Sequence, residues 1–505
     1  MKRILPILII IFLLSSIPTY AKVQKDGRLW QDETIYSIMV DRFNDGDTKN
    51  DIDMNTKDPL SYNGGDFQGI IDKLDYIHDM GFTTIRLTSI FDNTLKGYHG
   101  YWVNDFYKTD EHFGSIETFK KLVNEAHKRK IKVLIDFVTN NVSPSHSWVN
   151  DPSKQDWFHK KQDILDLNNA TELENGWVNG LPDLNQENSE VKKYLIDAAK
   201  WWIKKTNIDG YSLPEVNNVP ISFWSDFSKE VKQAKHNFFL LGIPLEKTSI
   251  DIKKYQEIGI DSSLNDQYSH NLRGLFANTD QSFTPLQTNY EKDLTWFKNP
   301  YLSANYFDNE NTVRFTRDIV EQRQFPGSRW KTALAYLYST PGIPVFYYGT
   351  EIALNGGGIP DNRQQMNFRA EKELIDYITK IGKLRNELPS LTRGTMEMLY
   401  EKNGMAVYKR VYKDETTIVA INNTRKSQHV TLDNKQVEGG KELRGLLEGD
   451  MVRSNNNKYD IILDRDKAEI YVLTKKSGLN ITLIGSLIVV YLFVILFLFK
   501  LKKRK

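Results

Sequence analysis

The sequence contains no cysteine among its 505 residues. A disulfide framework, a thiolate metal site and a thiol nucleophile are therefore all excluded. It also lacks an excess of charge of one sign, since 67 lysine and arginine residues face 65 aspartate and glutamate residues. Binding of nucleic acid through bulk charge is not expected. What the chain does have, 40% hydrophobic and 12% aromatic residues, is typical of a folded protein with a large core.

Both ends of the chain carry a long hydrophobic run. Residues 1–21 begin with Lys2 and Arg3, continue as an apolar stretch and finish with small residues at Ala21, which is the pattern of a cleaved signal peptide. Residues 479–499 contain no charge, and a helix of roughly 20 apolar residues spans a bilayer. We therefore predict a signal peptide at 1–21 and a C-terminal transmembrane helix at 479–499.

The charges at these ends also predict the orientation in the membrane. Residues 500–505 are a basic tail, and clustered lysine and arginine stay on the cytoplasmic side. The bulk of the chain is then extracellular, and we expect a single-pass cell membrane protein on a bacterial surface. The end segments hold seven of the 67 basic residues, so the exported part is mildly acidic.

Between the ends, strand-like apolar runs alternate with amphipathic helical patterns such as 116–128 and 191–206. This alternation predicts an α/β fold, a (β/α)8 TIM barrel, over residues 22–389. Residues 141–184 break the pattern and are too long for an ordinary connection, so we predict an inserted subdomain after strand 3. Short alternating segments in residues 390–474 predict a C-terminal antiparallel β domain. The strands are expected at 35–40, 83–88, 132–138, 210–213, 238–241, 262–265, 305–307 and 343–347.

Several segments, in their order and spacing, resemble the α-amylase family, glycoside hydrolase family 13, over about residues 30–473. They lie at 35–47, 64–70, 97–107, 134–141, 181–188, 340–352 and 360–366. The resemblance implies a barrel with a loop domain after strand 3 and a C-terminal β-sandwich. It also implies cleavage of α-glucosidic bonds by a retaining mechanism, which uses a nucleophilic carboxylate and an acidic carboxyl about 5–5.5 Å apart.

The positions that carry this chemistry in the family are occupied by other residues here. Asp136 matches, but Ser212 stands for the strand-four arginine and Pro214 for the nucleophile, while Ile243 and Asn311 stand for the general acid and the third carboxylate. Proline has no oxygen to attack with, and isoleucine has no proton to donate. No catalytic residue is therefore assigned at these positions, and the sequence predicts that hydrolysis has been lost.

Displaced carboxylates could rebuild the site. Glu215, Glu246, Asp308 and Glu310 lie near the affected strand ends. Glu215 follows Pro214 directly, and successive strand side chains point to opposite faces, so Glu215 is expected to miss the site. Glu310 could project into the cleft. A rebuilt pair would need two carboxyl groups with separated pKa values.

The residues expected to contact sugar are better retained. By the resemblance, His99, Tyr101 and Trp102 form the floor beneath the central sugar, although they could equally pack the barrel mouth. Arg86 stands where the family usually has tryptophan, which alters the wall of the cleft.

The resemblance also implies calcium. Six residues match the N-terminal calcium loop of related members: Asp45, Asp47, Asn50, Asp51, Gly64 and Asp66. Calcium prefers six to eight hard oxygen ligands, which closely spaced Asp, Asn and carbonyl groups supply. A second calcium site would use Asn140 and Asp183, together with the carbonyl of Asn218 in place of a histidine.

From these observations we predict a membrane-anchored, extracellular α-amylase-like protein that is catalytically inactive. It would bind an α-glucan or a membrane or surface protein partner, and no nucleic acid. The alternative is an active α-glucan hydrolase of amylase or α-glucosidase type that uses a reorganised site. A third possibility is a purely structural role without sugar binding.

Overall fold

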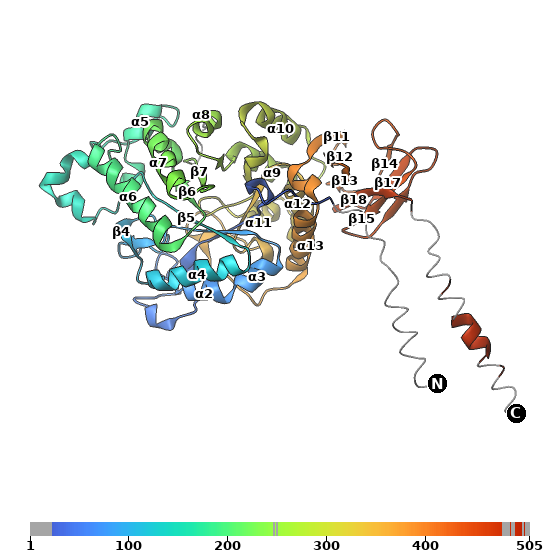
Figure 1. Cartoon of the computed structure of the whole chain (residues 1–505), viewed down its shortest axis with the longest axis horizontal. Coiled ribbons are helices and arrows are strands. Elements are labelled where there is room, and N and C mark those ends of the chain that lie inside the picture. The colour runs from blue at the N-terminus through green and yellow to red at the C-terminus, as the bar shows by residue number, and fades with distance from the viewer. Residues whose placement is uncertain are drawn as a thin grey trace.

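The computed structural model describes residues 23–245, Thr248 and residues 251–476, with positions 485, 490–496 and 499 near the C-terminus. The predicted signal peptide, the basic tail and most of the predicted membrane span lie outside the described residues. Among the residues that are described, no helix is both long enough and apolar enough to cross a membrane. Figure 1 shows a barrel of strands and helices at one end and a β domain at the other.

Eight parallel strands form the barrel. In spatial order they are β8 (Ser262–Ser263), β7 (Phe239–Ile243), β6 (Gly210–Pro214), β5 (Lys132–Asp136), β2 (Thr84–Leu87), β1 (Ile35–Ile38), β10 (Ile343–Tyr347) and β9 (Ala304–Tyr306). A parallel bridge between Leu264 and Ala304 joins the two outer strands and closes the sheet on itself. The predicted (β/α)8 barrel is confirmed, and β8 is the shortest of its strands.

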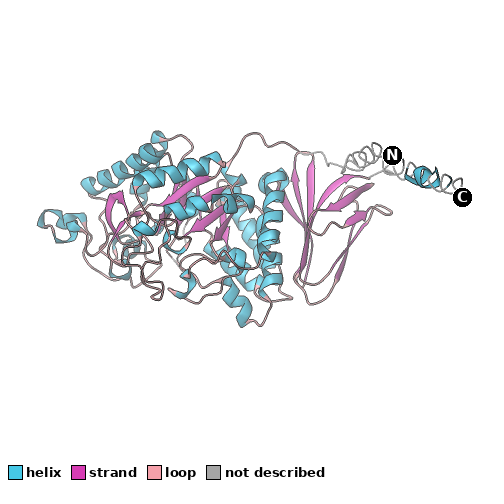
Figure 2. Cartoon of the chain, turned by 90° about the horizontal axis from the view of Figure 1, so that it is seen from below, coloured by secondary structure: helices cyan, strands magenta, loops and turns pink. Residues whose placement is uncertain are grey.

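Helices cover the outside of this barrel (Figure 2). In chain order they are α2 (Phe67–Asp72), α3 (Leu74–Asp79), α4 (Ile116–Lys128), α6 (Ser189–Thr206), α7 (Ile221–Ala234), α8 (Ile252–Glu257), α9 (Asp266–Phe276), α10 (Thr284–Trp296), α11 (Phe315–Glu321), α12 (Pro326–Ser339) and α13 (Glu373–Glu387). The sequence explains α4 locally, because Ser115 caps its first turn by accepting a hydrogen bond from the Thr118 amide. Its buried residues, Phe119, Leu122, Val123 and Ala126, recur at helical spacing and face the core.

Residues 141–184, which we call the inserted segment, separate β5 from α6. They contain the short helix α5 (Ala170–Asn175) and three 3-10 turns. Antiparallel bridges pair Asn141 with Asp183 and Phe158 with Leu184, so both ends of the segment meet at the barrel. A small hairpin of β3 (Phe91–Asn93) and β4 (Val103–Thr109) lies earlier in the chain.

A short helix, α14 (Pro389–Arg393), leads into the C-terminal domain. Its main sheet has the order β11 (Thr395–Lys402), β12 (Met405–Tyr412), β13 (Glu415–Asn422), β18 (Lys467–Lys475), β15 (Lys441–Gly445) and β16 (Met451–Arg453). A second pair joins β14 (Gln428–Leu432) to β17 (Tyr459–Leu463). All of these pairs are antiparallel, which confirms the predicted antiparallel β domain.

The β domain is fixed to the barrel chiefly through α12, which packs against β13 and β18 (Figure 1). At this contact Arg329 donates to Asp466 Oδ1 at 2.9 Å, and Ser339 Oγ lies 2.5 Å from the Tyr408 hydroxyl. Buried polar contacts of this kind fix the relative position of two domains, because they form in only one arrangement. The barrel mouth, at the carboxyl ends of the strands, is formed by loops.

Candidate functional site

Arg86, on β2, is the centre of the barrel mouth and is 1% exposed. Its Nε and Nη2 donate to Asp136 Oδ1 and Oδ2 at 2.8 and 2.7 Å. Its Nη1 and Nη2 also donate to Glu310 Oε2 and Oε1 at 3.1 and 2.7 Å. One guanidinium group therefore forms two hydrogen bonds with each of two carboxylates. This bidentate geometry is the strongest for an arginine–carboxylate pair. We call Arg86, Asp136 and Glu310 the ion cluster.

Three hydroxyl groups complete the hydrogen bonding of the ion cluster. The Tyr101 hydroxyl lies 3.1 Å from Asp136 Oδ2 and 3.2 Å from Glu310 Oε1, so it can donate to either carboxylate. Ser37 Oγ accepts from Arg86 Nη1 at 2.8 Å. Ser212 Oγ accepts from Arg86 Nε at 3.1 Å and donates to Asp136. Every carboxylate oxygen of the cluster thus has a donor, as buried charges require.

The strand register explains why these residues meet. Arg86 is paired with Ser37 on one side and with Leu134 on the other, and Asp136 lies two residues beyond Leu134. Residues two apart on a strand point to the same face, so Asp136 joins Arg86 inside the barrel. Glu310 reaches the cluster from the loop that follows β9.

Burial and charge act in opposite directions on the two carboxyl groups. Burial raises the pKa of Asp136, and the neighbouring Glu310 charge adds to this effect against the attraction of Arg86. Burial would also raise the pKa of Glu310, but the charge and hydrogen bonds of Arg86 outweigh it and hold that pKa below its usual value. Asp136 is therefore the better proton donor and Glu310 the better anion.

The spacing of this pair is set by the arginine. Asp136 Oδ2 and Glu310 Oε1 each lie 2.7 Å from Arg86 Nη2, so the two oxygens are separated by no more than twice that distance. Retaining glycosidases hold their two carboxyl groups about 5–5.5 Å apart. The two oxygens of the ion cluster thus lie no farther apart than the carboxyl groups of such a pair.

The residues that stand at the family's catalytic positions do not come together as one group in the structure. Ser212 belongs to the hydrogen bonds of the ion cluster, and Pro214 is the last residue of β6. Ile243 ends β7 and is buried in an apolar group with Leu241 and Leu264. Asn311 lies outside the ion cluster, where its Oδ1 accepts from Arg363 Nη2 at 3.3 Å.

Sequence reasoning considered Glu310 but overlooked the partnership with Arg86. The available signal was the arginine itself, which interrupts an otherwise uncharged strand. A charged residue in a barrel interior needs counter-charges. Asp136 on the neighbouring strand was one candidate, but the second could be found only from the position of the loop after β9.

The predicted sugar floor is brought together at the same mouth. The His99 ring stacks on Tyr101 with centroids 5.5 Å apart and meets Trp102 edge-on at 4.7 Å. Burial, with the charges of Arg363 and Arg42, lowers the pKa of His99 to about 3. Its imidazole is therefore neutral at ordinary pH. Trp102 remains partly exposed, and Tyr101 alone of the three hydrogen-bonds the ion cluster.

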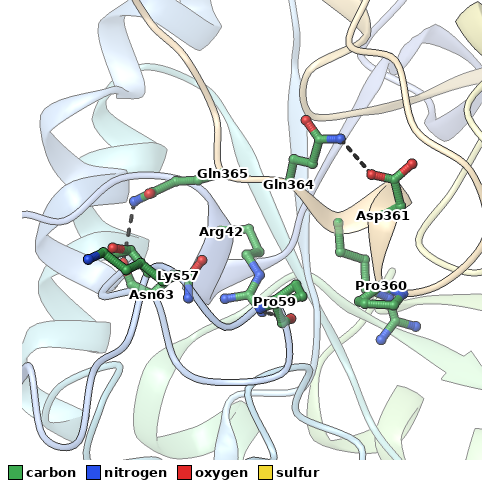
Figure 3. A pocket seen from close by; sticks show the side chains of 10 residues that line it. Arg42, Lys57, Pro59, Asn63, Pro360, Asp361, Gln364 and Gln365 are labelled. Atoms are coloured by element: carbon green, nitrogen blue, oxygen red, sulfur yellow. Dashed lines mark hydrogen bonds between the residues drawn. The ribbon is translucent and has the colours of Figure 1, made fainter.

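A cavity of about 320 Å³ lies between the loop at 56–63 and the loop at 360–365 (Figure 3). It is joined to the ion cluster through one residue. Arg363 connects the two, because it lines the cavity and donates through Nε to the Glu310 carbonyl at 2.9 Å. In the close-up, Gln364 points to Asp361 and Gln365 points to Asn63, through hydrogen bonds of 2.9 and 3.3 Å. This polar lining can exchange hydrogen bonds with hydroxyl groups of a ligand.

The predicted calcium loop gathers its oxygens at the start of α2. Asp66 caps this helix and accepts from the amides of Gly69 and Asp47 at 2.6 and 2.8 Å. Gly64 has a φ of 91°, and a Cβ there would lie 3.0 Å from Asp51 Oδ1. Burial and the charges of Asp51, Asp66 and Asp47 raise the pKa of Asp45. Asn50 Oδ1 and Asp51 Oδ1 are buried and have no hydrogen-bond partner among the described residues.

These donors fit a calcium ion in number and chemistry. Across the described part of the chain, no three His, Cys, Asp or Glu side chains converge tightly enough to hold a metal by themselves. A cation here would therefore also depend on Asn50 and on backbone oxygens. The second predicted pair, Asn140 and Asp183, is fully buried between β5 and the inserted segment.

Comparisons with known proteins agree along most of the chain. Residues 37–387 match the family model described as alpha amylase, catalytic domain, and residues 394–471 match the alpha-amylase C-terminal domain. An Anoxybacillus α-amylase structure is 57% identical with a TM-score of 0.88, over 90% of this chain and 100% of that one. The α-amylase of Geobacillus thermoleovorans complexed with acarbose is 54% identical with a TM-score of 0.86, over 89% and 100%.

A sequence relative shows the same likeness within a longer protein. The β/α-amylase of Paenibacillus polymyxa is 33% identical over 88% of this chain, but the matched part is 38% of that relative. The chain thus spans well under half the length of this relative.

These findings contradict the prediction of a catalytically inactive binding protein. Relatives that match most of the chain carry the names of enzymes. The error came from judging Pro214 and Ile243 one position at a time. That judgement did not anticipate that Arg86 holds Asp136 and Glu310 together from other elements.

Proposed function

The chain belongs to the α-amylase family, and we propose that it is an active α-glucan hydrolase whose catalytic carboxyl groups have moved. In this proposal Pro214 and Ile243, at the family's nucleophile and acid positions, take no part in the reaction. Asp136 and Glu310 are the catalytic residues instead. The observation that supports it is the ion cluster, in which two carboxyl groups at the mouth have pKa values shifted in opposite directions. An acid and a nucleophile in one site need pKa values separated in this way.

The proposed reaction follows the retaining scheme. Glu310, ionised beside Arg86, attacks the anomeric carbon and forms a glycosyl ester while the glycosidic C–O bond breaks. Asp136 gives its proton to the leaving oxygen. Water then attacks the anomeric carbon, Asp136 takes a proton from it, and the ester bond to Glu310 breaks. Arg86 Nη2, which now bridges both carboxyls, must release one of them when the sugar binds.

The sugar-binding assignment is also part of the proposal. Trp102 offers a partly exposed ring for stacking, and neutral His99 offers hydrogen bonds to hydroxyl groups. The cavity beside Arg363 would hold a further part of the glucan. Support comes from the related Geobacillus α-amylase, whose structure contains acarbose.

Calcium is proposed as a structural ion. Asp45, Asp47, Asn50, Asp51, Gly64 and Asp66 would hold one ion, with Asn140 and Asp183 at a second site. When bound, calcium supplies positive charge that neutralises converging oxygens and fixes their loops. Export through residues 1–21 and anchorage of an extracellular, bacterial-surface protein through 479–499 remain predictions from the sequence.

Activity on defined substrates tests the proposal. The purified protein should release reducing ends from starch and maltooligosaccharides, with the α-anomer as first product because the mechanism is retaining. Glu310→Gln should lower kcat by roughly 10³-fold or more, as loss of a nucleophile does in other enzymes. Glu125→Gln, on the surface of α4, is the matched control and should leave the rate unchanged.

A second measurement separates the two roles. An α-maltosyl fluoride carries a leaving group that needs no proton, so Asp136→Asn should regain most of its kcat/KM on it, which reports formation of the glycosyl ester alone. Glu310→Gln should remain inactive. Absence of hydrolysis by the unaltered protein, or full activity of Glu310→Gln, would refute the proposed function.

A further inference from the structure

A second cavity, of about 290 Å³, lies at the end of the barrel opposite the mouth. We call it the base cavity. Its wall includes Thr83, which directly precedes β2, and Lys130, two residues before β5, whereas Asp136 is the last residue of β5. The length of the barrel strands therefore separates it from the ion cluster. Its volume is near the lower limit of about 300–1,000 Å³ for small-molecule sites, so the base cavity suits a small ligand.

The side chains charged at neutral pH that line the base cavity are mostly basic. They are Lys25, Arg28, Arg129 and Lys130, and in the described part of the chain Asp32 is the one acidic residue of the wall. A cavity lined by charges of one sign focuses their field and raises the local concentration of counter-ions. The base cavity is thus expected to attract anions.

The two arginines of the wall are held in place by the protein itself. Arg28 Nε and Nη2 donate to the two carboxylate oxygens of Glu33 at 2.7 and 2.6 Å. Its Nη1 donates to the Lys130 carbonyl at 2.7 Å. Arg129 Nε and Nη2 donate to the two oxygens of Asp75 at 2.6 and 3.2 Å. Because most of their donors are used, the arginines supply positive charge rather than hydrogen bonds to a ligand.

The two lysines of the wall keep donors available. Lys25 Nζ lies 3.4 Å from Asp32 Oδ1, a long contact for a hydrogen bond. That oxygen is already engaged, because Arg393 Nε and the Thr392 hydroxyl donate to it at 3.0 and 2.8 Å. Within the described ranges, the Lys130 ammonium forms no hydrogen bond or ion pair. A lysine ammonium has three donors and binds phosphate as a point charge.

Lys25 is also poorly compensated in its surroundings, where its side chain is 18% exposed. Burial lowers the pKa of Lys25, and the charges of Arg385 and Arg393 add to this effect. The attraction of Asp32 opposes it only in part. A largely buried ammonium group among other cations is stabilised by an anion that lies beside it.

We infer that the base cavity binds a doubly charged phosphate group, with Lys25 and Lys130 as its direct ligands. The two arginines of the wall act as fixed positive charges. A phosphate group carries roughly two negative charges at neutral pH, which two available ammonium groups match better than they match the single charge of a carboxylate. The ligand is inorganic phosphate or a small phosphate monoester. The inference does not depend on hydrolysis, because the site lies at the other end of the barrel.

Calorimetric titration with sodium phosphate at constant ionic strength tests the inference. Lys25→Gln and Lys130→Gln should each lower the phosphate affinity by roughly tenfold or more, because each removes a charged hydrogen bond. Lys413→Gln is the matched control, since Lys413 pairs with Asp26 at 2.6 Å and does not line the cavity. It should change the affinity by less than about threefold, because exposed charges are screened by salt. No phosphate binding by the unaltered protein, or equal losses in all three variants, would overturn the inference.

The choice of anion gives a second test. Sodium acetate should bind at least about tenfold more weakly than phosphate, because it carries one charge instead of two. Acetate that binds as tightly as phosphate contradicts a phosphate site. Glycerol 3-phosphate distinguishes the two sources of the group: tighter binding than that of phosphate identifies a monoester, and weaker binding identifies the inorganic ion.

Thermal unfolding distinguishes a ligand from a merely structural residue. Without phosphate, Lys25→Gln should unfold at the same temperature as the unaltered protein or higher, because repulsion from Arg385 and Arg393 is removed. With phosphate present, the variant should lose most of the rise in Tm that the ligand gives the unaltered protein. An equal fall in Tm with and without phosphate would mean a structural role and would overturn the inference, whereas lack of hydrolysis leaves it untouched.

Discussion

The ion cluster and the buried group of Asn140, Asp183 and Asn218, which we call the open polar cluster, lie at the same end of one barrel but are satisfied in opposite ways. In the ion cluster, one guanidinium and the hydroxyl groups of Tyr101 and Ser212 bond every oxygen of two carboxylates. In the open polar cluster, five buried side-chain atoms have no partner in the part of the chain that the structure describes. The carboxylate oxygens of the ion cluster all have donors within the protein. The unpartnered atoms of the open polar cluster need a ligand from outside the protein.

The difference shows where a buried charge obtains its compensation. Arg86 lies on a strand, so its position is fixed by the barrel itself. The open polar cluster draws Asp183 from the inserted segment, which lies outside the barrel sheet and packs through α5 against the turn after β6. A cation is a suitable partner at such a junction, because it binds oxygens from both sides without requiring a shared strand register.

Arg86→Leu should have the largest effect on this comparison. It removes the only cation of the ion cluster and leaves two carboxylates buried without compensation. The free energy of unfolding should fall by about 3–5 kcal/mol, measured by urea denaturation near neutral pH. Glu310→Gln should cost less, because the bond between Arg86 and Asp136 remains. A loss in the free energy of unfolding of under about 1 kcal/mol for Arg86→Leu would show that the two carboxylates do not depend on Arg86 for compensation of their charge.

Removal of calcium should have the next largest effect and should act on the open polar cluster. A ligand at 100 times its dissociation constant stabilises the folded state by about 2.7 kcal/mol. EDTA should therefore lower the Tm, and readdition of calcium should restore it. The inserted segment should also be cleaved faster by trypsin without calcium. An identical Tm in EDTA and in calcium would contradict the proposed sites.

The pH profile should separate the two carboxyl groups of the ion cluster. The pKa of Glu310 lies below its usual 4.5, so its contribution to stability is present above pH 4.5 and is lost as the pH falls through the lowered value. The pKa of Asp136 lies above its usual 3.8, so its contribution is lost as the pH rises through the raised value.

The same two groups should shape the rate. The value of kcat/KM should fall about tenfold per pH unit beyond each limb, with Glu310 setting the acid limb and Asp136 the alkaline limb. Asp136→Asn should remove the alkaline limb on α-maltosyl fluoride. If that limb persists in the variant, another group is the acid.

Trp102→Ala should have the smallest effect, because it changes the floor and leaves both clusters intact. Loss of stacking against a sugar should cost about 1 kcal/mol and raise KM several-fold with little change in kcat. Trp296→Ala, on the outside of α10 where the side chain is 57% exposed, is the matched control. A fall in kcat with unchanged KM would place Trp102 in the chemistry instead.

Much of the fold could be predicted from the sequence, because the hydrophobic period and the length of a helix or strand are local properties of the sequence. The range 116–128 matches α4 residue for residue, since a cap and a complete apolar face mark its limits. The weak strand at 262–265 shortens to Ser262–Ser263, where little apolar sequence is present to define it. The pairing of Arg86 with Glu310 could not be predicted, because it joins residues 224 positions apart through a loop.

The closure of the barrel between β8 and β9 has a dynamic consequence. This seam depends on the Leu264–Ala304 bridge and on the Asn265 amide, which donates to the Ala304 carbonyl at 3.0 Å. By contrast, β6 and β7 are paired over five residues. Local opening is easiest where backbone hydrogen bonds are fewest. Amide hydrogens of β8 should therefore exchange with deuterium before those of β6. The barrel then opens locally between β8 and β9, while the side of the sheet that holds Asp136 remains paired.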